Sequence, residues 1–188
     1  KEQLIFPEIN YDNVLKINNI NGNNVLQEIC SDRTIMSPLN EQGFIQLSEW
    51  LERKGINVKH INNNNENVLH TICSSVIEFE HAELKNLVEW AHKKGVDVSH
   101  KNAEGYTFLH LLCEKPLYYF DDKNGYKLND VLMQMHQLGF DFHQKNNKDK
   151  SVYQMIMRDN HLSKSVKDSF LLQLELKITD DKIKKVRI

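Results

Sequence analysis

Four copies of one seven-residue pattern, spaced almost evenly, constrain the fold of this chain more than any other feature. The copies read NVLQEIC at residues 24–30, NVLHTIC at 67–73, TFLHLLC at 107–113 and SVYQMIM at 151–157. From one copy to the next the chain advances by 43, 40 and 44 residues. Gly55, Gly95 and Gly139 advance by nearly the same steps, 40 and 44. Two markers that advance together indicate a structural repeat.

The third copy indicates what one unit contains. Gly95 follows an amphipathic run and can adopt the positive φ that ends a helix. The short extended stretch after it leads into a turn with Gly105 at its tip, and Thr107 is suited to cap the apolar helix that follows. Apolar residues at helical spacing predict further helices at 44–54, around 84–91, at 128–138 and at 166–177. Each unit is therefore predicted to contain an outer helix, a hairpin-like arm and an inner helix.

In these features the chain resembles the ankyrin repeat, which has an arm, a glycine-containing turn and a T-P-L-H helix start. The third unit carries Gly95, Asp97, Val98, Asn102, Gly105, Thr107, Leu109 and His110 in the matching places. The second carries Gly55, Asn57, Val58, Asn62, Leu69 and His70, with Asn65 in place of the turn glycine. The end units diverge: the first keeps Gly22 but has Gln27 for the histidine, and the fourth has Asp149, Ser151 and Gln154. Because Asn tolerates positive φ better than most residues, Asn65 is expected to adopt it.

The resemblance implies an all-α fold, an ankyrin-repeat solenoid of helix-turn-helix units joined by short hairpin-like arms. It implies a single domain over residues 1–188, with about four repeats near 18–58, 59–98, 99–142 and 143–180. An ankyrin unit has about 33 residues, so these units are longer. The additional residues fall between inner and outer helices, at 31–40, 74–82 and 114–129. We expect the chain to be a fragment of a longer protein, or a processed form of one.

Composition limits the classes of function. The chain is 40% hydrophobic and 27% charged with a net charge of −2, so it has no basic field for nucleic acid. No apolar run reaches the roughly 18 residues that predict a membrane span. Three cysteines, one per repeat, predict buried small side chains rather than a disulfide framework. We expect a monomer in the cytoplasm, or in a host cell's cytoplasm if the protein is a secreted effector. The 21 Asn and four Arg favour an origin in an intracellular bacterium, a large virus or a protozoan.

Histidine and cysteine lie three residues apart in two inner helices, at His70 with Cys73 and at His110 with Cys113. That spacing places both side chains on one face, where a metal pair or an activated thiol is conceivable. The structural interpretation is preferred: the histidine bonds locally to the cap and turn, and Gln27 and Gln154 do the same. The sequence also lacks phosphate-loop and hydrolase motifs. We therefore expect no catalytic, cofactor-binding or metal-binding residues here, and no enzyme.

A second set of histidines lies in the arms. His60 and His100 both lie five residues after a glycine stop, and His143 lies four after one. They are expected to line up along the arms, where they face either neighbouring arms or a ligand. Both interpretations remain open, and in the second case binding would change between pH 5 and 8.

Stacked repeats leave a concave surface formed by arms and inner helices. The resemblance therefore implies a protein–protein interaction module that binds a partner protein there. The candidate arm residues are Lys59, His60, Ile61, Asn63, Glu66, Ser99, Lys101, Ala103, Glu104, Tyr106, His143, Lys145 and Lys148. Tyr106 is the preferred anchor, because aromatic residues dominate binding hot spots. Tyr118, Tyr119 and Phe120, together with Leu117, form a second candidate surface, unless their rings fold back over the helices.

Two other functions stay open. The repeats could be the targeting or substrate-recruiting module of a larger effector that contains an enzyme. They could also only cap or dimerise the parent chain. A catalytic motif in a neighbouring domain would favour the first of these.

Overall fold

A computed structural model describes residues 17–32, 41–74, 81–114, 128–172 and 174. Within these ranges every regular element is a helix, apart from one isolated bridge between Lys145 and Ser151. The predicted all-α class is therefore confirmed over this part of the chain.

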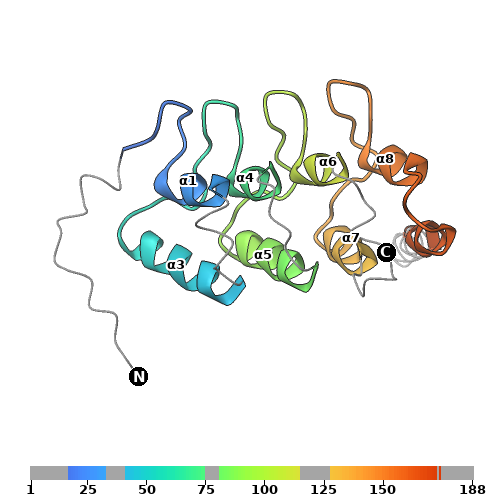
Figure 1. The fold of residues 1–188 in the computed structure, drawn as a ribbon, viewed down its shortest axis with the longest axis horizontal. Coiled ribbons are helices and arrows are strands. Elements are labelled where there is room, and N and C mark those ends of the chain that lie inside the picture. Colours follow the sequence, from blue (N-terminus) through green and yellow to red (C-terminus); the bar gives the residue numbers. More distant parts are fainter. Residues whose placement is uncertain (1–16, 33–40, 75–80, 115–127, 173, 175–188) are drawn as a thin grey trace, which may run out of the picture.

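The helices form two rows (Figure 1). The inner row consists of α1 (Val25–Ser31), α4 (Val68–Ser74), α6 (Phe108–Cys113) and α8 (Val152–Arg158). The outer row consists of α3 (Glu41–Arg53), α5 (His81–Lys93), α7 (Leu128–Gln137) and a helical segment at 164–172. In the inner row α1 packs on α4, α4 on α6 and α6 on α8, and in the outer row α3 packs on α5 and α5 on α7. Each unit therefore contacts mainly its neighbours.

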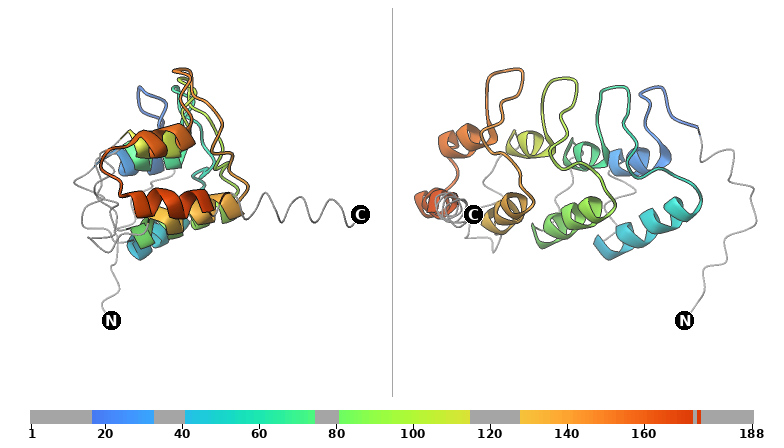
Figure 2. Two further views of the ribbon diagram at one scale, coloured as in Figure 1. Left: turned by 90° about the vertical axis from the view of Figure 1, so that its right-hand side faces the viewer. Right: turned by 180° about the vertical axis from the view of Figure 1, so that it is seen from behind.

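Loops that lead into the inner helices lie side by side along one edge of the molecule (Figures 1 and 2). We call these loops the arms: the first arm is residues 17–24, the second 55–67, the third 95–107 and the fourth 139–151. They appear at the same edge in the views from the side and from behind (Figure 2). The repeat in the sequence thus becomes a row of like loops in space.

Short polar motifs start the inner helices. In α6 the Thr107 hydroxyl accepts a hydrogen bond from the backbone N–H of His110, and the His110 ring accepts one from the backbone N–H of Thr107. Asn24 with Gln27 and Ser151 with Gln154 form the same reciprocal cap on α1 and α8. Helices this short are marginal in isolation. Their stability must therefore come from packing between the two rows.

That packing is apolar and largely continuous. Phe44 of α3 and Trp90 of α5 meet edge to face, with ring centroids 5.4 Å apart. Further along, Phe108, Phe140, Phe142 and Phe170 form a chain of ring contacts with centroid distances of 6.4, 5.1 and 5.3 Å. All of these side chains are buried. Aromatic contacts therefore connect the third unit to the fourth across the core.

The predicted burial of the cysteines is confirmed for Cys30 and Cys73 and is only partial for Cys113. Cys30 and Cys73 are buried, Cys113 is half-buried, and all three are free thiols. Burial raises the pKa of Cys30, and it raises the pKa of Cys113 to about 12. Both groups are therefore thiols at neutral pH and fill space as small apolar side chains.

Candidate functional site

Each arm is shaped by one asparagine. The side-chain oxygen of Asn102 accepts hydrogen bonds from the backbone N–H groups of Glu104 and Tyr106, at 3.1 and 2.9 Å. The same pair of bonds forms at Asn19, Asn62 and Asn146. These four asparagines are spaced by 43, 40 and 44 residues, the steps of the sequence pattern. The arms are consequently preformed loops with a common backbone course.

The tips of these loops use positive φ, as predicted. Asn65 and Asp149 have φ of 59°, and Gly22 and Gly105 take the equivalent places with φ of 74° and 75°. Gly105 is also approached closely, because a Cβ there would lie 2.5 Å from the side-chain oxygen of Asn147 in the fourth arm. Glycine is therefore required at this place for space as well as for conformation.

Backbone hydrogen bonds join neighbouring arms. The N–H of Ala103 donates to the carbonyl of Asn64 at 2.9 Å, and the N–H of Asn147 donates to the carbonyl of Glu104 at 3.1 Å. The second arm is joined to the first in the same way, from Asn63 to the carbonyl of Asn21 at 3.1 Å. The arms therefore present one connected surface rather than separate flexible loops.

Two of the arm histidines also bridge arms. His60 Nε2 lies 2.7 Å from the carbonyl of Gly22, and His100 Nε2 lies 2.9 Å from the carbonyl of Asn65. A carbonyl only accepts, so Nε2 is the donor in both contacts. His143 does not continue this row, since its exposed ring packs against Tyr153 with centroids 4.8 Å apart. The structural interpretation of His60 and His100 is therefore the one these contacts support.

The inner-helix histidines make the predicted local bond and a second, longer-range one. His110 Nδ1 lies 2.8 Å from the Thr107 hydroxyl, which confirms the local role. Its Nε2 lies 3.1 Å from the carbonyl of Lys150, in the next arm. His70 Nε2 reaches the carbonyl of Tyr106 in the same way, at 2.9 Å.

Gln27 makes the equivalent pair of contacts in the first unit. Its side-chain oxygen accepts from the N–H of Asn24 at 3.3 Å, and its Nε2 donates to the carbonyl of Glu66 at 2.9 Å. Sequence reasoning missed these links between units. The available signal was that each of these positions holds a side chain with two separate polar atoms, Gln or His.

Most of the predicted contact residues lie on the outer surface of the arms. The exposed ones are Lys59, Ile61, Asn63, Ala103, Glu104, His143, Lys145 and Lys148. His60, Glu66, Ser99 and Lys101 are half-buried. Tyr118, Tyr119 and Phe120 lie outside the described residues.

Tyr106 requires a correction, because it does not project from its arm. Its side chain is only 1% exposed. The ring contacts His110 at 5.8 Å between centroids, and Lys148 Nζ lies 5.2 Å from its centre. The hydroxyl donates to a carboxylate oxygen of Glu114 at 2.8 Å. Tyr106 thus packs between its own helix and the fourth arm, and we remove it from the candidate contact residues.

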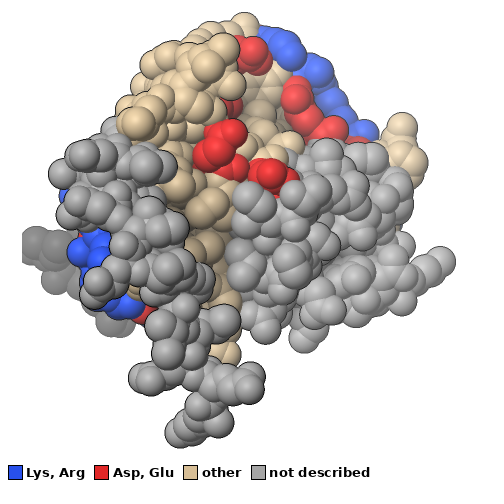
Figure 3. All heavy atoms as spheres, turned by 60° about the vertical axis from the view of Figure 1, so that its left-hand side comes forward, with Lys and Arg blue, Asp and Glu red and all other residues tan. Residues whose placement is uncertain are grey.

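The face seen in Figure 3 has an uneven distribution of charge. Acidic side chains gather near its middle, and a run of Lys and Arg follows part of its edge. Glu28 of α1 and Glu114, the residue that follows α6, are exposed acidic residues. The surface can therefore discriminate between partners by charge.

Two further kinds of feature, metal clusters and membrane-spanning helices, are absent from the residues described. They contain no group of three or more His, Cys, Asp or Glu side chains that could hold a metal ion. Among the described helices, none has the length and apolar character needed to cross a membrane. No protein-family model matches the chain, and comparison with curated proteins gives no match.

Proposed function

We propose that the chain is an ankyrin-type solenoid and that it binds a partner protein through the outer surface of its arms. Two rows of helices with a row of arms along one edge support this proposal. Stacked helical repeats of this kind commonly use such extended surfaces for protein binding.

One observation carries the proposal: the arms share their internal contacts and differ in their outward side chains. The asparagine that shapes the loop recurs in all four arms. Two positions after it, the exposed residue is Asn21 in the first arm, Asn64 in the second, Glu104 in the third and Lys148 in the fourth. A fixed backbone with varied exposed side chains is what selective recognition requires.

The test compares two variants with the same change in charge. Asn64→Arg with Ala103→Arg places two bulky cations on the arms, and Gln46→Arg with Asn86→Arg places two on the outer helices α3 and α5. All four positions are exposed. Each purified chain is immobilised, and proteins captured from lysate are quantified by mass spectrometry.

A partner that is captured by the parent chain and by the outer-helix variant, but lost with the arm variant, is the expected result. Loss with the outer-helix variant alone would place the binding surface elsewhere and contradict the proposal. Circular dichroism of each variant checks that the loss does not come from unfolding.

A further inference from the structure

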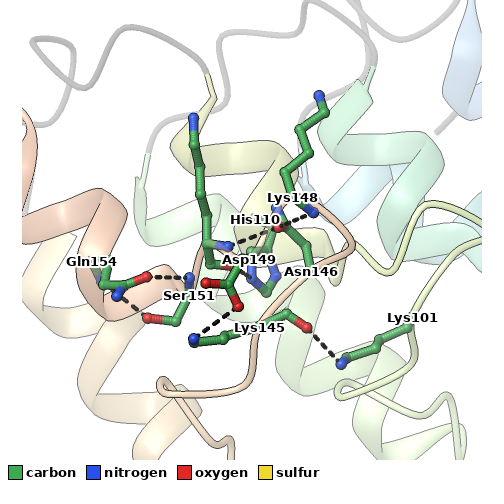
Figure 4. Close-up of polar contacts among 9 residues, drawn as sticks. Lys101, His110, Lys145, Asn146, Lys148, Asp149, Ser151 and Gln154 are labelled. Atoms are coloured by element: carbon green, nitrogen blue, oxygen red, sulfur yellow. Dashed lines mark hydrogen bonds and ion pairs between the residues drawn. The ribbon is translucent and has the colours of Figure 1, made fainter.

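Four lysines lie on the third and fourth arms: Lys101, Lys145, Lys148 and Lys150. Lys101 Nζ donates to the backbone carbonyl of Lys145 at 2.8 Å, so its ammonium is held against the next arm (Figure 4). Lys145 pairs with Asp149 at 2.8 Å. No ion pair joins Lys101 or Lys150 to a carboxylate among the residues described. Two of the four charges are thus uncompensated by an ion pair.

Lys148 is held in place by Glu114 and by the ring of Tyr106, and its ion pair with Glu114 is long. Its Nζ lies 3.9 Å from a carboxylate oxygen of Glu114, at the limit of an ion pair, and 5.2 Å from the centre of the Tyr106 ring. The same carboxylate oxygen accepts the Tyr106 hydroxyl at 2.8 Å. A cation over an aromatic ring stays available to another anion on its open side.

The second and fourth arms differ at the residue four positions after the asparagine that shapes the loop. In the second arm, Asn62 Nδ2 donates to the carboxylate of Glu66 at 3.0 Å. In the fourth arm the residue equivalent to Glu66 is Lys150, and both N–H groups bond the asparagine oxygen, at 2.9 and 3.0 Å. Asn146 Nδ2 is buried and has no hydrogen-bond partner among the residues that the structure describes. The fourth arm therefore carries an ammonium group at the place where the second arm has a carboxylate and the third arm has Tyr106.

This difference between the second and fourth arms changes the charge of the arm surface. Residues 143–150 contain three lysines and one aspartate, and residues 59–66 contain one lysine and one glutamate. In going from the second arm to the fourth, Ile61 corresponds to Lys145 and Asn64 to Lys148. The second arm as a whole is therefore neutral, and the fourth arm, residues 139–151, carries three lysines against Asp141 and Asp149.

We propose that an acidic segment of the partner protein docks over the third and fourth arms, with its carboxylates on Lys101, Lys148 and Lys150. This inference rests on the proposed function and adds the chemistry of the partner. Charge complementarity of this kind steers association and excludes unsuitable partners.

An acidic peptide suits this surface better than a nucleic acid. Glu104, Glu114 and Asp149 lie among the lysines, and the whole chain has a net charge of −2. A phosphate backbone carries negative charge at every nucleotide and would meet these carboxylates. A peptide can place a neutral or basic residue opposite each of them.

The test selects short random peptides, displayed on phage, against the full chain. Peptides that emerge are then titrated by fluorescence anisotropy against two variants with equal loss of positive charge. Lys148→Gln with Lys150→Gln removes charge from the fourth arm, and Lys85→Gln with Lys93→Gln removes it from α5. We expect the selected peptides to be enriched in Asp and Glu, and to bind the arm variant about tenfold more weakly. The α5 variant should bind like the parent chain, and affinity should fall as salt rises.

The possible failures are distinguishable. Peptides without acidic enrichment, or acidic peptides that bind the arm variant as well as the parent, would overturn this inference and leave the proposed protein-binding function standing. Selection that yields no binding peptide would count against both. A fluorescent single-stranded oligonucleotide that binds more tightly than the acidic peptides would also overturn it.

Discussion

His70 Nε2 lies 2.9 Å from the backbone carbonyl of Tyr106, 36 residues later in the chain. This contact ties α4 to the third arm, and His110 ties α6 to the fourth arm in the same way. Because both rings are buried, each bond is shielded from water. Neighbouring units therefore share their polar contacts as well as their core, so we expect them to unfold cooperatively.

Replacing this histidine should be costly. His70→Leu leaves the Tyr106 carbonyl and the cap at Asn67 without their buried partner, so we expect a loss of about 3 kcal/mol in the free energy of unfolding. Urea denaturation followed by circular dichroism measures it. His70→Gln should lose less than half as much, since Gln27 makes both types of contact in the first unit. Equal losses in the two variants would show that ring packing, and not hydrogen bonding, holds the arm.

The same histidines predict a dependence of stability on pH. Burial lowers the pKa of His70 and His110 below the ordinary value of 6.5. In the unfolded chain they take up protons near 6.5, so between that pH and the lower folded pKa the unfolded state binds more protons. Stability should be constant above about pH 7 and fall as the pH drops below 6.5. Urea midpoints at several pH values measure this, and the double variant His70→Gln with His110→Gln should show a flatter profile.

Alanine substitutions at two glycines with similar φ distinguish the cost of backbone conformation from the cost of a steric clash. Gly105 and Gly139 have φ of 75° and 84°, but of these two only Gly105 lies where an added methyl group would meet another atom, in Asn147 of the next arm. We expect Gly139→Ala to cost about 1 kcal/mol for its positive φ. Gly105→Ala should cost at least about 1 kcal/mol more, because the arms must separate. Thermal unfolding of both variants tests this, and equal costs would contradict the close approach of the arms.

The sequence predicted the conformation of the arms well because that conformation is local. Positive φ at Asn65 and Asp149 follows from their alignment with Gly105, and each asparagine bonds within four residues of itself. The caps at Thr107 and Ser151 are equally local. Such contacts are set by residue type and spacing, both of which a sequence contains.

Contacts between units were less predictable. The burial of Tyr106 depends on Lys148 and on the course of the fourth arm, more than 40 residues away in the chain. The second nitrogen of His110 likewise finds its acceptor only when the next arm is in place. Tyr106 and its neighbour Glu104 look alike as candidate contacts in sequence, yet one is buried and the other exposed. Whether a side chain on one arm is exposed depends on how the adjacent arm packs against it.

The side-chain amide of Asn146, which has no hydrogen-bond partner among the described residues, permits the prediction of a variant that is more stable than the parent chain. Lys150→Glu recreates in the fourth arm the pairing of Asn62 with Glu66, where the amide and carboxylate are 3.0 Å apart. A hydrogen bond to a charged group contributes about 1.5 to 3 kcal/mol, part of which is lost in desolvating and ordering the carboxylate. We therefore expect the variant to be more stable than the parent chain by about 1 kcal/mol.

The control is Lys150→Met, which removes the same ammonium and supplies no acceptor. It should leave the unfolding free energy within about 0.5 kcal/mol of the parent, because position 150 is exposed. The gain from Lys150→Glu should also disappear in an Asn146→Ala background, since the amide is then absent. We expect Lys150→Glu to do two things at once: to gain stability and to weaken the binding of acidic peptides. That pair of results would show that Lys150 contributes to binding and not to the stability of the fold. A gain of equal size in Lys150→Met would instead assign the effect to relief of repulsion among the four lysines.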